Sequence, residues 1–265
     1  MTDTTAPRPA PAQATQPTQP SVFDHRLQPR LVLPLLALLI AFPLIAQATG
    51  EDFYIGVASR VLVFGLAAAS LNFILGFGGM VSFGHAAFVG LGAYTVGLLM
   101  QQGISSAWLA WPLAMLMGAA FSLLVGAISL RTQGVYFIMI TLAFAQMLYY
   151  LIMSFKALGG DDGLSLPGRS DIGLGLDLAQ DATFYYVVLA LVTVSLLLMA
   201  RVLNARFGHV LQAIKENETR MQAIGFPVYR YKLVAFSLAG AFAGLAGALL
   251  ANQSSFVGPG MLQWT

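Results

Sequence analysis

The chain contains no cysteine among its 265 residues, and charged residues make up only 9% of it. Without cysteine it can form no disulfide, no cysteine-ligated zinc site and no thiol nucleophile. Hydrophobic residues account for 58% of the chain and the mean hydropathy is +0.77. This balance is far from that of an ordinary soluble domain. The composition therefore predicts that most of the chain lies in lipid.

Motifs for catalysis are missing as well. The sequence has no GxxxxGK[ST] phosphate loop, no HExxH zinc motif and no GxSxG elbow, and no carboxylates cluster in an apolar run. The Gly-rich stretch GFGGMVSFG at Gly76–Gly84 lacks the lysine that a phosphate loop requires. We therefore expect no enzymatic activity, no catalytic residue, no metal site and no cofactor on this chain, and no nucleic acid as a partner.

Apolar runs recur along nearly all of the chain after residue 30. A helix of about 20 residues crosses a hydrocarbon core of roughly 30 Å. Seven runs qualify: Leu31–Thr49, Tyr54–Leu75, Gly84–Met100, Ala107–Leu130, Val135–Phe155, Phe184–Leu203 and Leu233–Ala251. The third is short and rich in small residues, so a bent or partly re-entrant element is an alternative there. The prediction is an all-α, polytopic transmembrane bundle of about seven spans.

Residues 1–30 differ from the rest. They are mostly Pro, Ala, Thr and Gln, with too few large apolar groups to fold on their own. We expect a disordered cytoplasmic tail at 1–30 and a membrane domain at 31–265. The apolar run begins only at Leu31, which disfavours a cleaved signal peptide.

The charges segregate by loop. If the spans alternate, one side receives Arg8, Arg26, Arg30, Arg131, Arg201, Arg206, Lys215, Arg220, Arg230 and Lys232. The other side receives Glu51, Asp52, Asp161, Asp162, Asp171, Asp177 and Asp181, with only Lys156 and Arg169 to balance them. Because cytoplasmic loops collect Lys and Arg, the amino terminus and the Arg201–Lys232 segment are expected inside.

Ionisable residues are scarce within the spans. None of the eleven acidic residues falls in mid-span, and only Arg60 and His85 lie near lipid, each close to a helix end. A snorkelling Arg and a hydrogen-bonded His at a bend are the favoured interpretations; proton coupling through His85 is the alternative. The lack of mid-span acids argues against an ion-driven secondary transporter.

Glycine is concentrated between Leu75 and Gly97. Two interpretations stay open: close packing of helix backbones, and a broken helix whose freed backbone groups line a solute path. The candidate path residues are Gly76, Gly78, Gly79, Ser82, His85, Gly90 and Gly92.

The charged segment Arg201–Lys232 has helical features. Its Phe207, Val210, Leu211 and Ile214 recur at helical spacing and form one apolar stripe. Asn204 is the expected N-cap, and Gly225 followed by Pro227 is a stop signal. Glu218 would continue the stripe, so either the helix breaks near Asn217 or this carboxylate faces a partner. The stripe itself either contacts a partner or packs under the bundle.

Four blocks of the sequence resemble the LivM-type permease subunits of branched-chain amino acid ABC importers. The blocks are LNFILGFGGMVSFGHAAFVGLGAYTVGLL (Leu71–Leu99), GVYFIMITLAFAQMLYYL (Gly134–Leu151), LGGDDGLSLPG (Leu158–Gly168) and FGHVLQAIKENETRMQAIGFPVYRYKLVAFSLAGAFAGLAGALLA (Phe207–Ala251). The resemblance implies a type II ABC importer-like permease in the bacterial inner membrane. It also implies a second, LivH-like permease, two cytoplasmic ATPases that hold ATP and Mg, and a periplasmic binding protein.

The resemblance also implies roles for particular segments. ENETRMQAIG looks like a degenerate form of the family's cytoplasmic coupling loop, which gives a coupling segment at 204–230. The expected ATPase-coupling residues are Phe207, Leu211, Lys215, Glu216, Glu218, Arg220, Ala223 and Gly225. Asp161, Asp162 and Asp171 are expected to contact the binding protein, with a solvated turn as the alternative. Family members usually continue beyond a segment like Asn252–Thr265, so a chain shortened at its C-terminus is expected.

Four functional interpretations compete. The first is a permease for branched-chain or related amino acids. The second is the same architecture serving another small solute, such as a urea, an amide or a sugar. The third is an ion-driven secondary transporter, and a membrane scaffold without transport is a weaker fourth.

Overall fold

The computed structural model describes residues 29–48, 50, 52–173 and 177–263. The expected disordered tail at 1–30 lies outside the described residues, except that Pro29 and Arg30 already belong to the first helix.

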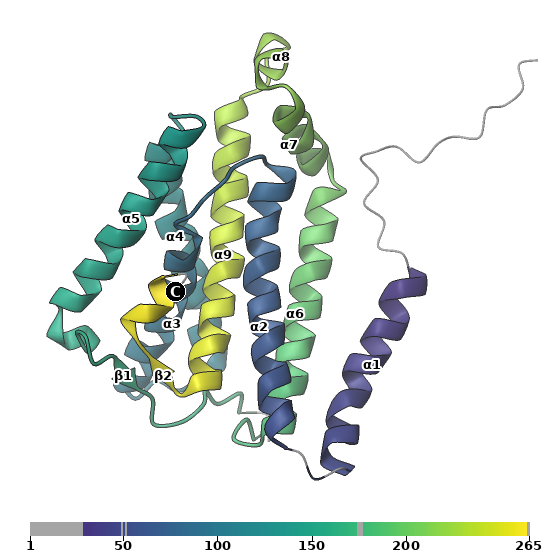
Figure 1. Ribbon diagram of the computed structural model, residues 1–265, viewed down its shortest axis with the longest axis vertical. Coiled ribbons are helices and arrows are strands. Elements are labelled where there is room, and N and C mark those ends of the chain that lie inside the picture. The colour runs from purple at the N-terminus through teal and green to yellow at the C-terminus, as the bar shows by residue number, and fades with distance from the viewer. Residues whose placement is uncertain (1–28, 49, 51, 174–176, 264–265) are drawn as a thin grey trace, which may run out of the picture.

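Long helices dominate the described part of the chain (Figure 1). The helices are α1 (Pro29–Ala48), α2 (Phe53–Asn72), α3 (His85–Gln101), α4 (Ala107–Ser129), α5 (Val135–Ser154), α6 (Asp181–Leu203), α7 (Arg206–Glu216), α8 (Glu218–Ala223) and α9 (Val228–Ser254). Short elements are η1 (Phe73–Phe77), η2 (Lys156–Leu158), η3 (Pro259–Leu262), β1 (Leu164–Ser165) and β2 (Phe256–Val257). The predicted polytopic helical fold is confirmed.

Five helical segments are long and apolar enough to cross a membrane: Phe53–Phe77, Ala107–Ser129, Val135–Ser154, Asp181–Leu203 and Val228–Ser254. Val32–Ala48 is a shorter apolar helix. The third predicted run forms α3, a helix of only 17 residues that is buried along most of its length. The seven predicted runs thus all become helices, and the third is the buried element allowed for by its small residues.

Helix α9 lies at the centre of the bundle and packs against α2, α3 and α4. Its glycines permit this closeness: a Cβ at Gly244 would strike the carbonyl of Ala114 on α4, and a Cβ at Gly247 would strike that of Val89 on α3. Small residues at helix interfaces are the usual means by which membrane helices bring their backbones together. The bundle is therefore built outward from α9.

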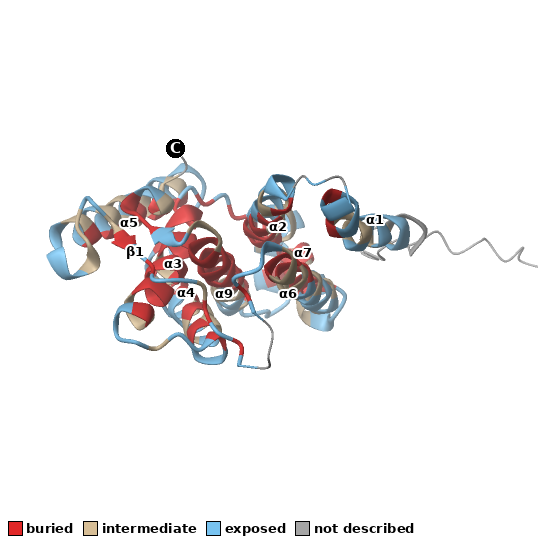
Figure 2. Cartoon of the chain, turned by 90° about the horizontal axis from the view of Figure 1, so that it is seen from below, coloured by how far each residue is buried: buried red, intermediate tan, exposed pale blue. Residues whose placement is uncertain are grey.

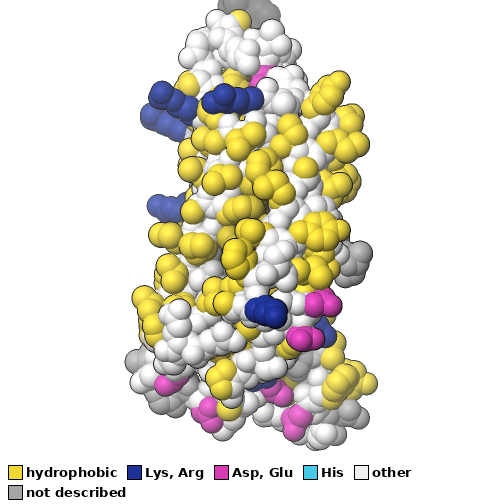
Figure 3. Space-filling view, turned by 90° about the vertical axis from the view of Figure 1, so that its left-hand side faces the viewer, with side chains coloured by type: hydrophobic (Ala, Val, Ile, Leu, Met, Phe, Trp, Pro, Cys, Tyr) yellow, Lys and Arg dark blue, Asp and Glu magenta, His cyan; other side chains and the backbone are white. Residues whose placement is uncertain are grey.

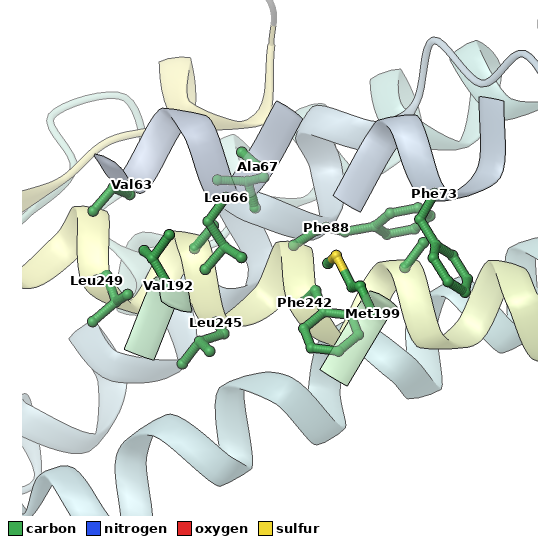
Figure 4. Close-up of a cluster of buried hydrophobic side chains, with 14 of the residues drawn as sticks. Val63, Leu66, Ala67, Phe73, Phe88, Val192, Met199, Phe242, Leu245 and Leu249 are labelled. Atoms are coloured by element: carbon green, nitrogen blue, oxygen red, sulfur yellow. The ribbon is translucent and has the colours of Figure 1, made fainter. Parts of the chain in front are cut away.

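The main core cluster lies where α2, α6 and α9 converge. Figure 4 shows Val63 and Leu66 of α2 and Val192 and Met199 of α6 spread along α9, and all four are buried in one cluster with Leu245. Figure 2 shows burial concentrated on α3 and α9, while α1 and α5 expose long faces. Large apolar side chains such as Met147 on α5, 67% exposed, have no protein neighbour to cover them and suit lipid or another subunit.

Charges gather at the two ends of the helices. Figure 3 shows, on one face, Lys and Arg side chains near the α8 end and most acidic side chains at the opposite end, with hydrophobic side chains between. A hydrophobic band between two charged ends is the pattern expected of a multi-pass membrane protein.

The segment between α5 and α6 folds over the end opposite α8. There β1 pairs antiparallel with β2, and Leu164 lies across from Val257. The buried side chain of Asn252 on α9 accepts a hydrogen bond from the Ser170 amide at 2.6 Å and donates one to the Ala248 carbonyl. This segment is thereby fixed to the end of the central helix.

Candidate functional site

The apolar stripe of α7 faces the bundle. Leu211 and Ile214 are fully buried, Val210 is half-buried, and the Phe207 ring stacks on Tyr231 of α9 with 5.5 Å between centroids. The second of the two predicted arrangements, packing under the bundle, is therefore the one observed. Leu211, a predicted coupling residue, touches only this chain's own core and can support a docking surface without forming part of it.

The boundaries of α7 correct one prediction. Asn204 ends α6, and the N-cap of α7 is Ala205, which offers no side-chain hydrogen bond. Helix α6 extends to Leu203, so Asn204 forms its C-cap. Only Ala205 then separates Asn204 from the first residue of α7, Arg206, and Ala205 takes the N-cap position.

The helix breaks at Asn217, the first of the two alternatives. Asn217 is extended (φ −156°, ψ 97°), and its side-chain oxygen accepts the Arg220 amide at 2.9 Å, capping α8. Glu218 then pairs with Lys232 of α9, whose Nζ lies 2.6 Å from Oε2. The predicted stop also holds, since α8 ends at Ala223 and Gly225 has φ +95°.

Beyond α8 the chain presents an exposed apolar tip, which we define as Ala223–Phe226. Ile224 is 63% exposed and Phe226 36%, while the buried Met221 anchors α8 just before them. The predicted coupling residues Glu216 and Arg220 are exposed beside this tip. An apolar surface surrounded by charge suits contact with another protein.

Lys215 joins two residue sets that the sequence left separate. Its Nζ donates a 2.6 Å hydrogen bond to the carbonyl oxygen of Gly76, at the end of η1. A Cβ on Gly79 (φ +67°) would lie 3.0 Å from the Lys215 stem. The predicted coupling helix therefore rests on the Gly-rich segment predicted to line a path.

That Gly-rich segment is a true break in the helical run. The wider π-type turn η1 continues α2 to Phe77, and residues 78–84 are not helical. Such turns are frequent at functional sites. Helix α3 then starts at His85, whose Nε2 lies 2.7 Å from the Ser70 hydroxyl. The hydroxyl of Ser82 and Nδ1 of His85 are buried without a hydrogen-bond partner among the described residues.

The other glycines of this region serve close packing. A Cβ at Gly84, Gly90 or Gly92 would strike, respectively, the Thr141 carbonyl, the Leu262 side chain or the Gly244 carbonyl. The first of the two interpretations thus accounts for these three positions. The second interpretation remains open for residues 78–84, which are not helical.

A cavity of about 200 Å³ opens at the α8 end, beside the break. The break supplies Gly79 and Met80 to its wall, the loop after α4 supplies Thr132 and Gln133, and the Glu218–Lys232 pair closes another side. Part of the Gly-rich segment therefore faces open space next to the exposed tip.

The three predicted acidic contacts all lie at the opposite end. Asp161 and Asp162 are exposed turn residues. Asp171 is held more firmly: its Oδ1 accepts the Gly173 amide at 2.8 Å, and its backbone bonds to Ser105 and Ala107 before α4. Asp171 therefore also joins the α5–α6 segment to α4.

Sequence reasoning missed residues whose partners are distant in the chain. Nothing in the spacing links Glu218 with Lys232, or Asn252 with Ser170, which lie 14 and 82 residues apart. A buried Asn near the end of an apolar helix was the one available signal. Arg60 was noted, but the two cavities that it lines could not be foreseen.

Comparison with known proteins gives a consistent result. The family described as branched-chain amino acid transport system / permease component matches residues 53–265. The high-affinity branched-chain amino acid transport system permease protein LivM of Escherichia coli (strain K12) is 29% identical, over 91% of this chain and 61% of that protein. LivM of Salmonella typhimurium shows the same identity and coverage.

An archaeal protein is more distant. The probable branched-chain amino acid transport permease protein LivM of Methanocaldococcus jannaschii is 26% identical, over 71% of this chain and 65% of that protein. The chain thus spans about three-fifths of the length of the bacterial relatives. No solved structure matches it significantly.

Proposed function

The chain belongs to the family of permease components of branched-chain amino acid transport systems, and on that premise we propose that it forms part of an import path for these amino acids. Its relatives' names support the solute class. The chain acts without chemistry of its own. Hydrolysis of ATP, with its Mg, belongs to separate ATPase subunits.

The observation that carries this proposal is the exposed apolar tip at the basic end of the bundle. Ile224, directly after α8, is 63% exposed, and Phe226 is partly exposed beside Tyr231, while Met221 and Ile214 hold the base of the tip in place. A short element of this kind fits a groove on a partner protein. The groove is that of a cytoplasmic ATPase, so that the tip passes the movement of the ATPase to the permease.

The surroundings of the tip agree with this orientation. Lys and Arg gather at the α8 end (Figure 3), which we therefore place in the cytoplasm. The bilayer is then the inner membrane of a bacterium. The opposite end, with Asp161, Asp162 and Asp171, receives the periplasmic binding protein. A second permease subunit covers part of the exposed apolar faces.

The test pairs two identical substitutions at exposed alanines of the same end. Ala223→Glu places a carboxylate in the docking tip, whereas Ala205→Glu places one at the start of α7, away from it. Burying an unpaired charge at a contact costs several kcal/mol. With the complete transporter expressed in a strain lacking it, uptake of radiolabelled leucine and co-purification of the ATPases are measured.

Ala223→Glu should abolish uptake and release the ATPases, and Ala205→Glu should do neither. Retention of the ATPases by the Ala223→Glu protein would remove the coupling role. If the wild-type transporter took up another solute but not leucine, the assignment of branched-chain amino acids as its solutes would be wrong. Gly225→Asp serves less well, because φ +95° would strain the backbone as well as the contact.

A further inference from the structure

Arg60 is an exposed cation in a membrane-spanning helix, and the described residues give it no partner. It lies seven residues after Phe53 in α2, about 10 Å along the helix at about 1.5 Å per residue. Among the described residues, none accepts a hydrogen bond from its guanidinium and none forms an ion pair with it. An ionisable side chain at such depth usually marks a functional site.

Two cavities adjoin this guanidinium. The outer cavity, about 410 Å³, lies at the end where α2 begins and is lined by Gly56, Val57 and Arg60, together with Asp181 and Gln253. The second, about 250 Å³, lies deeper and is lined by Arg60 and by apolar side chains of α2, α3, α9 and η3: Phe64, Ala67, Val89, Leu250 and Met261. Arg60 therefore lines both a cavity with mixed polar and apolar walls and a second, mainly apolar one.

The outer cavity also carries acceptors for a positive group. Among the described residues, Arg169 pairs with Oδ1 of the Asp181 carboxylate and none contacts Oδ2. The Gln253 amide donates to the Gly56 carbonyl at 3.0 Å, and its own oxygen is buried without a donor among the described residues. The walls thus offer a cation and acceptors around one space, with apolar surface beyond them.

We propose that this space, the Arg60 site, binds an apolar amino acid on its way through the membrane. The guanidinium of Arg60 holds the α-carboxylate through two parallel hydrogen bonds, the geometry that arginine favours. The α-ammonium faces Asp181 and Gln253. The branched side chain enters the second cavity against Phe64, Leu250 and Met261, where its burial is favourable.

This inference rests on the proposed function and adds to it a named contact. A lipid phosphate is the competing occupant, because guanidinium recognises phosphate equally well. The acid and the apolar cavity favour the zwitterion. A phosphate group would gain nothing from the Asp181 carboxylate.

The test measures binding of radiolabelled L-leucine to the full chain in nanodiscs. Arg60→Gln removes the charge, Arg60→Lys keeps the charge without the paired donors, and Arg201→Gln is the control, an exposed arginine in the last turn of α6. Losing charge-assisted hydrogen bonds should raise Kd about 10- to 100-fold for Arg60→Gln and less for Arg60→Lys. Arg201→Gln should leave Kd unchanged.

A second measurement uses a chain that keeps Arg60, so a folding defect in an Arg60 variant cannot explain its result. The chain has no native cysteine, so Val57→Cys gives one thiol in the outer cavity. Leucine should slow its labelling by a water-soluble thiol reagent, as should 4-methylpentanoate, which keeps the carboxylate. 3-Methylbutylamine, which lacks the carboxylate, should not. Adding Arg60→Gln should abolish the protection.

The outcomes separate the two proposals. If the complete transporter imports leucine and Arg60→Gln binds and imports it as the wild type does, the site is wrong and the proposed function stands. If leucine binding and import are unchanged in Arg60→Gln but less lipid co-purifies with this variant, Arg60 binds a lipid phosphate. If leucine does not bind but another amino acid does, with the same Arg60 dependence, the site stands and the solute class falls.

Discussion

The ammonium of Lys215 lies 2.6 Å from the carbonyl oxygen of Gly76, so that α7, at the basic end of the bundle, is hydrogen-bonded to the end of a membrane span. Gly76 belongs to η1, the last helical turn before the break at residues 78–84. A displacement of α7 therefore pulls directly on the break. The link offers a short route from the exposed tip to the helix break.

Lys215→Met tests this route. It removes the hydrogen bond but keeps the apolar stem that covers Gly79. Stability should fall by only about 1 kcal/mol, because Lys215 is exposed. Uptake per ATP hydrolysed should fall far more, as measured in proteoliposomes. Arg201→Gln, at an exposed position in the last turn of α6, is the control, and equal coupling in both variants would disprove the route.

Gly92→Ala tests close packing in the core. The added methyl would meet the backbone carbonyl of Gly244, which cannot move aside as a side chain can. Overpacking of this kind typically costs about 1–3 kcal/mol. Gly65→Ala, where nothing lies within 4 Å, should be neutral or slightly stabilising. Thermal inactivation in detergent compares them; lost uptake with unchanged stability would instead place Gly92 on the solute path.

Orientation can be read with single cysteines. Asp161→Cys should react with an impermeant thiol reagent in cells whose outer membrane is permeabilised, because Asp161 is exposed at the proposed periplasmic end. Arg220→Cys, exposed at the α8 end, should react only after the inner membrane is opened. The reverse order of labelling would invert the topology.

Asp161→Asn together with Asp162→Asn tests the binding-protein contact. Both side chains are exposed, so the fold should be unaffected. Each ion pair with the binding protein should contribute about 1 kcal/mol or less, and the loss should be largest at low salt. Stimulation of ATP hydrolysis by the binding protein is measured across salt concentrations. If stimulation showed the same salt dependence in the variant and the wild type, Asp161 and Asp162 would belong to a solvated turn without a partner.

Asp171→Asn is a separate case. The amide oxygen of Asn can still accept the Gly173 hydrogen bond, so the turn before α6 should persist. Any loss of stimulation in this variant therefore reports charge and not a disturbed loop. Thermal stability equal to that of the wild type is the accompanying check.

Much of the fold follows from local signals in the sequence. Hydropathy located the spans because a helix in lipid must be apolar along its whole length, and α9 and α6 fall where such runs occur. Capping residues act over only a few positions. The break at Asn217 and the end of α8 before Gly225 were therefore within reach of sequence reasoning.

The direction of the α7 stripe was beyond such reasoning. Leu211 and Ile214 would show the same apolar spacing whether they contacted a partner or the bundle. The position of α9 determines that they pack against the bundle. The same holds for contacts between distant residues: Lys215 and Gly76 are 139 positions apart. Arg60 was predicted to snorkel because sequence gives depth along a helix and not the shape of neighbouring space.

The order of synthesis gives the central place of α9 a consequence for assembly. About 125 residues separate the end of α4 at Ser129 from the end of α9 at Ser254, or roughly 6 to 25 s of translation. Throughout that interval the small-residue faces around Gly92 and Gly118 have nothing to pack against. The unfinished bundle is therefore a target for membrane proteases. A substitution that delays insertion of α9 would reduce the amount of protein in the cell even if the finished transporter worked normally.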